Sequence, residues 1–136
     1  MSRNISNSLK KLVAKRANFK CEYCLLADRL SFYSFHIEHI RSVKHGGNDN
    51  QENLAYCCPE CNFAKGSDIA TFVGESDEIT RFFNPRRDNW NDHFMVSNSM
   101  ILGKTPIGKA TEQIFRFNDI ERLIFRKQLA ELGLYP

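Results

Sequence analysis

The sequence predicts an α+β fold in which two short strands precede a helix, with further helices on either side. Residues 32–40 (FYSFHIEHI) are rich in aromatic and β-branched side chains, a composition typical of a strand. A polar stretch with two adjacent glycines follows, and residues 53–57 form a second, short apolar run. Residues 58–65 are then expected to turn into a helix. The chain would thus fold around a strand–loop–strand–helix segment.

The N-terminal residues predict a basic, amphipathic helix over residues 8–19. Its apolar side chains fall on one helical face, namely Leu9, Leu12, Val13 and Ala17. Ser6 or Asn7 is placed to cap its first turn. Residues 1–20 contain no acid, and their basic side chains are Arg3, Lys10, Lys11, Lys15, Arg16 and Lys20. Such a run is either a solvated helix face or a surface that contacts phosphates.

The C-terminal half carries weaker patterns. A helix is expected within residues 67–84, although Gly74 and nearby acids interrupt its apolar pattern. Residues 94–102 predict a hairpin that turns near Ser97 and Asn98. This part of the chain holds no motif of known chemistry.

Two further helices have recognisable starts. Thr105 followed by Pro106 is a capping residue and a proline in the first helical position. A last helix is expected after Asn118, with Glu121 placed for a capping box, and it should end at Gly133. The segment 84–94 between the two halves contains Arg86, Arg87, Trp90 and His93, which form either a nucleic-acid contact or a packed corner.

Length and charge bound the possible functions. A chain of 136 residues is expected to be a single domain, with a core at about 8–70 and a mostly helical extension at about 71–136. The net charge of +3 attracts an anionic polymer only weakly, so the local distribution of charge matters more. No apolar stretch reaches membrane-spanning length and the N-terminus lacks the apolar core of a signal peptide, which predicts a soluble, cytoplasmic protein.

Four of the five cysteines form two Cys-x-x-Cys pairs, Cys21 with Cys24 and Cys58 with Cys61. Such pairs let four thiolates reach one ion at about 2.3 Å, which predicts one structural Zn²⁺ per chain. The alternatives are four buried free thiols or two disulfides, and a reducing compartment favours the metal. Cys57 is expected to be a small core residue, because strand alternation points it away from Cys58.

The segment from Cys21 to Gly66 resembles the HNH endonuclease family. His39 matches the first letter of that name, Asn53 the second, and Asn62 stands where the family has the third, His or Asn. The resemblance implies a ββα-metal core with a zinc knuckle, in which two strands and one helix hold a catalytic metal. The long spacer between the cysteine pairs agrees with it, since many HNH proteins insert their hairpin there.

The resemblance also implies a separate role for each catalytic residue. His39 would be the general base, and Glu38 and Asn62 would hold a divalent ion through oxygen atoms, which suits Mg²⁺ or Mn²⁺. Asn53 would orient the loop backbone and the His39 ring. The family most often has Asp where this chain has Glu38, a change that keeps the carboxylate and adds a methylene.

The resemblance to HNH endonucleases further implies that the substrate is double-stranded DNA, cleaved to leave 5′-phosphate and 3′-hydroxyl ends. Expected phosphate contacts lie on the core and on the basic N-terminal helix: Lys65, Arg41, Lys44, His45, Lys10, Lys11, Lys15 and Arg16.

Each candidate also has a structural interpretation when it is taken alone. Asn53 can cap a turn, Asn62 can cap a helix, and His36 is expected to be structural. Taken together and in this order, the residues favour a nuclease. The alternatives are a zinc-stabilised nucleic-acid-binding module without catalysis, or an accessory subunit of a larger nuclease system.

Overall fold

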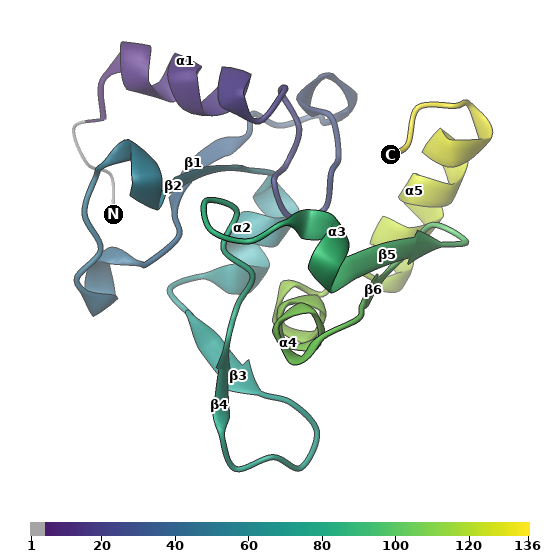
Figure 1. The fold of residues 1–136 in the computed structure, drawn as a ribbon. Coiled ribbons are helices and arrows are strands. Elements are labelled where there is room, and N and C mark those ends of the chain that lie inside the picture. Colours follow the sequence, from purple (N-terminus) through teal and green to yellow (C-terminus); the bar gives the residue numbers. More distant parts are fainter. Residues whose placement is uncertain (1–4) are drawn as a thin grey trace. The chain divides into compact units, whose positions relative to one another are not determined.

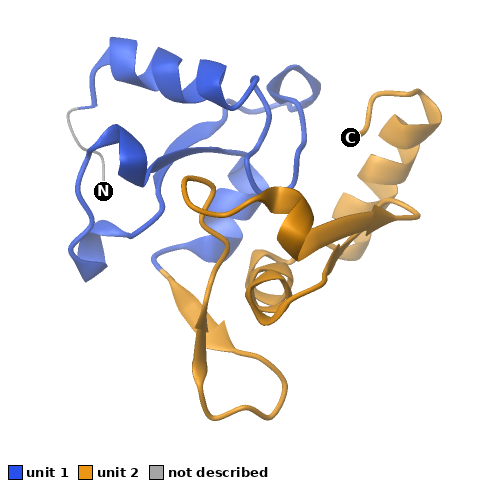
Figure 2. Cartoon of the chain, viewed as in Figure 1, with its two compact units in different colours: residues 1–67 blue, residues 68–136 orange. Residues whose placement is uncertain are grey.

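The computed structural model describes residues 5–136, so Arg3 lies outside the described residues. The chain divides into two compact units, residues 1–67 and residues 68–136 (Figures 1 and 2). The predicted core and extension meet close to this division.

Unit 1 begins with the predicted basic helix. Helix α1 spans Asn7–Arg16, and the Ser6 hydroxyl accepts a hydrogen bond from the Leu9 amide at 3.2 Å, which caps the first turn. Val13 is fully buried, whereas Leu12 is 41% exposed, so the apolar face is narrower than the sequence predicts. The Arg16 guanidinium donates to the carbonyl oxygen of Leu54 at 2.7 Å, and this bond ties the helix to the second strand.

The predicted strand–loop–strand–helix order is confirmed. Strands β1 (His36–His39) and β2 (Leu54–Cys57) form an antiparallel ribbon in which Glu38 faces Ala55 and His39 faces Leu54. Helix α2 spans Pro59–Lys65. Short 3₁₀ turns precede the ribbon at Asp28–Leu30 and lie within its loop at Val43–His45 and Gln51–Asn53.

The first strand is shorter than predicted. Residues 32–35 do not pair with a neighbouring strand, and the side chains of Phe32 and Tyr33 are exposed. Instead, the Ser31 hydroxyl donates to the Tyr33 carbonyl at 2.9 Å, which bends the chain ahead of the strand. Aromatic content alone therefore overstated the strand's length.

Unit 2 opens with a hairpin where the sequence predicted a helix. Strands β3 (Ala70–Phe72) and β4 (Ile79–Arg81) pair antiparallel, so the helix expected within residues 67–84 is wrong. Gly74 has a φ of 60°, a left-handed conformation that suits a turn. The glycine that interrupts the helical pattern is part of the connection between two strands.

The rest of unit 2 follows the predicted order more closely. Helix α3 (Trp90–His93) leads into a second hairpin, β5 (Phe94–Ser97) and β6 (Met100–Gly103), which turns at Asn98 and Ser99. Helix α4 (Pro106–Phe115) starts as predicted, with the Thr105 hydroxyl accepting from the Gly108 amide at 3.0 Å.

Helix α5 spans Ile120–Glu131, and its predicted capping box is wrong. The N-cap is Asp119, not Asn118, and its side chain makes no capping bond. The Asn118 side chain instead pairs with the backbone of Ile101, accepting from its amide and donating to its carbonyl, each at 2.9 Å. A tertiary contact to β6 thus replaces the local cap.

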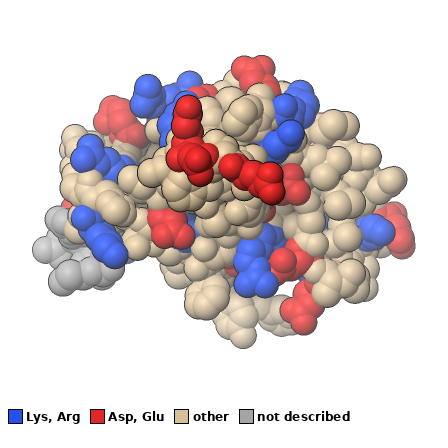
Figure 3. All heavy atoms as spheres, turned by 90° about the horizontal axis from the view of Figure 1, so that it is seen from below, with Lys and Arg blue, Asp and Glu red and all other residues tan. Residues whose placement is uncertain are grey.

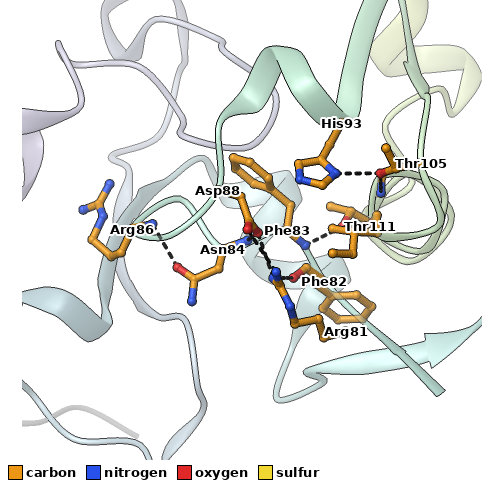
Figure 4. A network of polar contacts seen from close by, with 11 residues as sticks. Arg81, Phe82, Phe83, Asn84, Arg86, Asp88, His93, Thr105 and Thr111 are labelled. Atoms are coloured by element: carbon orange, nitrogen blue, oxygen red, sulfur yellow. Dashed lines mark hydrogen bonds and ion pairs between the residues drawn. The ribbon is translucent and has the colours of Figure 1, made fainter.

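The core of unit 2 is aromatic, and its buried rings are Phe82, Phe83, Phe94, Phe115 and Phe117. Segment 84–94 packs onto this cluster, and the centroids of the Trp90 and Phe94 rings are 5.0 Å apart. His93 Nδ1 lies 2.6 Å from the Thr105 hydroxyl, a contact drawn in Figure 4. For Trp90 and His93, these contacts favour the packed corner over the nucleic-acid contact.

A bidentate ion pair closes the turn after β4. The Arg81 guanidinium donates to both carboxylate oxygens of Asp88, at 2.7 and 2.9 Å, and the Asn84 amide donates to the same carboxylate at 2.9 Å (Figure 4). Hydrogen bonding to Arg81 holds the pKa of Asp88 below its ordinary value. Because the folded-state pKa is depressed, this pair stabilises the fold above the ordinary aspartate pKa and is lost as the pH falls through the depressed value.

We expect Asp88→Asn to lower the free energy of unfolding by about 1–2 kcal/mol at neutral pH, since charge-assisted bonds are removed from a partly exposed pair. Urea unfolding at neutral pH and at about pH 3 measures it, and the difference between wild type and variant should shrink at the lower pH. Asp77→Asn, in the exposed turn between β3 and β4, is the matched control. An Asp88→Asn variant as stable as wild type at neutral pH would contradict this account of the turn.

Candidate active site and metal centre

Four cysteines come together in unit 1. The sulfur atoms of Cys21, Cys24, Cys58 and Cys61 all lie within 4.8 Å of one another, and all four residues are buried. In a tetrahedral site with Zn–S bonds of about 2.3 Å, the sulfurs are about 3.8 Å apart. The Sγ atoms of Cys24 and Cys58 are 3.6 Å apart, so the cluster has the size of such a site.

Backbone amides support this sulfur cluster. The Cys24 amide donates to Cys21 Sγ at 3.5 Å, and the Cys61 amide donates to Cys58 Sγ at 3.3 Å. Without an ion, hydrogen bonds among the thiols raise the pKa of Cys58, and burial raises the pKa of Cys61. Raised pKa values favour the neutral thiols. A zinc ion favours the deprotonated thiolates instead, because thiolates are the form that it binds. The donor set, the spacing and the amide bonds therefore all fit zinc.

Cys57 is buried in the ribbon beside the cluster but is not a member of it. Burial raises the pKa of its thiol well above the ordinary value, which keeps it neutral. This environment agrees with the expected core position.

Three of the four predicted catalytic residues, Glu38, His39 and Asn62, line one cavity, and Asn53 does not. A cavity of about 800 Å³ in unit 1 is lined by Glu38 and His39 from β1 and by Asn62 from α2. Lys10 of α1 and Lys44 of the connecting loop also line it. The cavity thus combines a carboxylate, an imidazole and an amide with positive charge.

Glu38 is one of the residues that line this cavity, and it is 5% exposed. Its Oε1 lies 2.6 Å from the Lys65 ammonium, and its Oε2 accepts from the Tyr23 hydroxyl at 2.8 Å. Burial raises the pKa of Glu38, and Lys65 opposes that shift. Tyr23 belongs to the first cysteine knuckle, so the fold around the cysteine cluster also positions the carboxylate.

His39 is fixed by an acid that the sequence pattern does not single out. Its Nε2 lies 2.7 Å from Oδ1 of Asp49, and the two side chains are 14% and 34% exposed. Asp49 follows the Gly-Gly turn, ten positions after the histidine. It lies in a polar stretch whose sequence does not distinguish a functional acid from a solvent-exposed one. The only available signal was an acid inside the loop that joins the two strands of the motif.

Comparison with known proteins agrees with this geometry. Residues 21–68 match the HNH endonuclease family. These residues are an HNH domain. The Septu protein PtuB of Bacillus thuringiensis is 29% identical over 124 residues, which are 89% of this chain and 45% of that protein. The chain therefore spans less than half the length of this relative, and no solved structure matches it significantly.

The HNH domain has the predicted ββα-metal architecture, built from β1, β2 and α2 beside the cysteine cluster. Asn53 stands at the second position of the motif and clamps the connecting loop. It accepts from the Arg41 amide at 2.8 Å and donates to the carbonyls of Arg41 and Asn48 at 3.0 and 2.8 Å. Gly47 lets these segments of the loop meet, because a Cβ there would lie 1.7 Å from the Arg41 carbonyl oxygen.

One predicted phosphate contact of unit 1 needs correction. Lys65 is 2% exposed, and its ammonium binds Glu38 and the His39 carbonyl, the latter at 3.1 Å, so it offers no surface to a phosphate. The Arg16 guanidinium is used within the fold by its bond to Leu54. Burial makes Lys65 structural, whereas Arg16 is exposed and its phosphate contact stays a prediction.

Other basic residues of unit 1 stay at its surface. Lys10, Lys11, Lys15 and Lys44 are exposed, and Arg41 folds back to donate to the His45 carbonyl at 2.6 Å. On the face of the protein drawn in Figure 3, acidic side chains lie among the lysines and arginines. Among residues 5–136, no helix is both long and apolar enough to cross a membrane.

Proposed function

We propose that this chain is a metal-dependent endonuclease that hydrolyses phosphodiester bonds of double-stranded DNA in its HNH domain. The observation that carries the proposal is the single cavity lined by Glu38, His39 and Asn62. Binding a nucleic acid needs none of these three residues, whereas hydrolysis needs a base and a site for a divalent ion.

His39 is the general base in this mechanism. Its imidazole accepts a proton from the attacking water, and its position at the end of β1 brings it to the cavity wall. Lys10 and Lys44 hold the DNA backbone near the cavity by charge. The products carry a 5′-phosphate and a 3′-hydroxyl.

Glu38 and Asn62 are the residues that would hold Mg²⁺ or Mn²⁺. One carboxylate and one amide oxygen fit these ions, which bind few protein oxygens and keep several waters. Lys65 and Tyr23 each bind one oxygen of the Glu38 carboxylate, and a carboxylate with these two partners has further lone pairs. When bound, such an ion neutralises charge on the phosphate and assists the leaving oxygen.

The products test the proposal directly. We expect purified protein with Mg²⁺ or Mn²⁺ to cut a labelled DNA duplex into fragments that a DNA ligase rejoins, since ligation requires a 5′-phosphate and a 3′-hydroxyl. Fragments that are joined only after phosphatase and kinase treatment would contradict the proposed chemistry.

Asn62→Ala tests the metal assignment. We expect cleavage to fall by about 10–100-fold at low Mg²⁺, with partial recovery at high Mg²⁺ or Mn²⁺, because removing a ligand weakens the ion's affinity. Initial rates across a Mg²⁺ titration measure it. Phe63→Ala, on the same helix and 89% exposed, is the matched control. A rate deficit that is the same at every Mg²⁺ concentration would argue against a ligand role for Asn62.

The basic face of α1 gives a second prediction. Replacing Lys10, Lys11 and Lys15 by Gln should weaken DNA binding and lower the slope of log K against log salt by about 1 for each phosphate that is no longer neutralised. Replacing Lys104, Lys109 and Lys127 of unit 2 removes the same charge and serves as the control. Equal salt slopes for the two triple variants would assign the α1 lysines to a solvated face.

Of the two alternatives, the accessory subunit of a larger nuclease system is favoured by a specific observation. Exposed apolar side chains on α5 favour it, because Ile120, Ile124 and Phe125 are 67%, 49% and 38% exposed. The similarity to a protein about twice as long agrees with this alternative. DNA cleavage by the purified chain alone would decide for the independent enzyme.

A further inference from the structure

We propose that Asp49 is a positioning residue for His39, accepting the Nε2 hydrogen so that Nδ1 is left as the proton acceptor of the ring. This inference rests on the proposed function for its catalytic meaning. The contact itself is a property of the fold and can be tested without DNA.

The first step is the chemistry of the contact. His39 Nε2 and Asp49 Oδ1 are 2.7 Å apart, the distance of a charge-assisted hydrogen bond. An ionised carboxylate has no hydrogen to donate, so the imidazole nitrogen must be the donor. A neutral imidazole carries one ring hydrogen, and placing it on Nε2 leaves the lone pair on Nδ1.

The second step is the rigidity of the loop that carries Asp49. The carbonyl of the preceding residue, Asn48, accepts from the Asn53 side-chain amide at 2.8 Å, and the Asn48 side chain accepts from the Asn50 amide at 3.0 Å. Asn53 also binds both the amide and the carbonyl of Arg41, two residues beyond His39. The residues on both sides of Asp49 are thus tied down, and one clamp joins them to the end of β1.

The third step connects this clamp to catalysis. A general base must present its lone pair in one orientation, and a fixed partner on the opposite nitrogen supplies that orientation at no cost during the reaction. The expected effect of Asn53 on the His39 ring is therefore transmitted through the loop that holds Asp49. Asn53 sets the loop, Asp49 sets the ring, and His39 accepts the proton.

The test measures the ring directly. ¹⁵N spectra of the histidine side chains at about pH 8.5, where an ordinary imidazole is neutral, distinguish a ring protonated at Nε2 from one protonated at Nδ1. The His39 signal is assigned by its disappearance in His39→Gln. We expect wild type to show the Nε2-protonated form, and Asp49→Ala to show a mixture of the two forms. Glu52→Ala, which removes a neighbouring exposed acid of the same loop, should leave the spectrum unchanged.

Cleavage kinetics supply the second readout. Asp49→Ala should lower kcat by about 10–100-fold while the Kd for DNA changes little, because the ring is misaligned but still present. A wild-type ring protonated at Nδ1, or an unchanged tautomer in Asp49→Ala, would overturn the inference. The spectra test the effect of Asp49 on the His39 tautomer even if the chain cleaves no DNA. Failure of the nuclease proposal is therefore distinguishable from failure of this inference.

Discussion

Cys58→Ala is expected to leave unit 1 without zinc and without a cooperative folding transition. Structural zinc sites contribute about 10–16 kcal/mol in small zinc-binding peptides, whereas an entire domain is stable by only about 5–15 kcal/mol. Cys58 also caps α2 by accepting from the Cys61 amide, so the substitution removes a ligand and a helix cap together. Elemental analysis for zinc and thermal melting followed by circular dichroism measure the two effects.

Cys57→Ala is the matched control, since it removes the neighbouring buried thiol that lies outside the cluster. We expect it to retain one zinc per chain. A wild-type protein that is folded and carries no zinc would overturn the metal assignment.

His39→Ala should lower the rate of DNA cleavage by roughly two to four orders of magnitude, the range typical when a general base is removed. The zinc content should not change, and the melting temperature should change little, because the ring is part-buried and its partner is a partly exposed carboxylate. Initial cleavage rates and melting curves on the same preparation measure both. His36→Ala, on the same strand and lining the same cavity, is the control and should remain active.

Local chemistry explains which elements the sequence could predict. The cysteine pairs lie at fixed short spacings, so their convergence on one site follows once the intervening ribbon folds. Thr105 before Pro106 specifies a helix start through bonds within one turn, and the structure confirms it. The ribbon followed immediately by α2 was equally predictable, because short connections leave few alternative arrangements.

Elements set by distant contacts were not predictable in this way. Asn118 stands where a helix cap was expected, but its amide pairs with Ile101 of another element. The helix expected within residues 67–84 is a hairpin whose strands pack with α4. Local propensity is a weak guide where pairing and packing decide the conformation.

The candidate site shows the same difference between features set by local sequence and features set by distant contacts. The sequence pattern selected Glu38, His39 and Asn62, and the structure brings all three to one cavity. The sequence pattern could not reveal that Lys65 is buried against Glu38, because a lysine in a helix is usually exposed. Only the distance between its ammonium group and the carboxylate shows the pairing. Asp49 was missed for a related reason, since its meaning lies in a contact across the loop.

The most direct test of the central claim is nicking of supercoiled plasmid by the wild-type protein after weakly bound ions have been removed by a chelator and the retained zinc has been measured. The account predicts no nicking by this protein alone, nicking on addition of Mg²⁺ or Mn²⁺, and almost none by His39→Ala under the same conditions. Nicking that is independent of added ions or equal in His39→Ala, or a wild-type protein inert with every divalent ion, would contradict it.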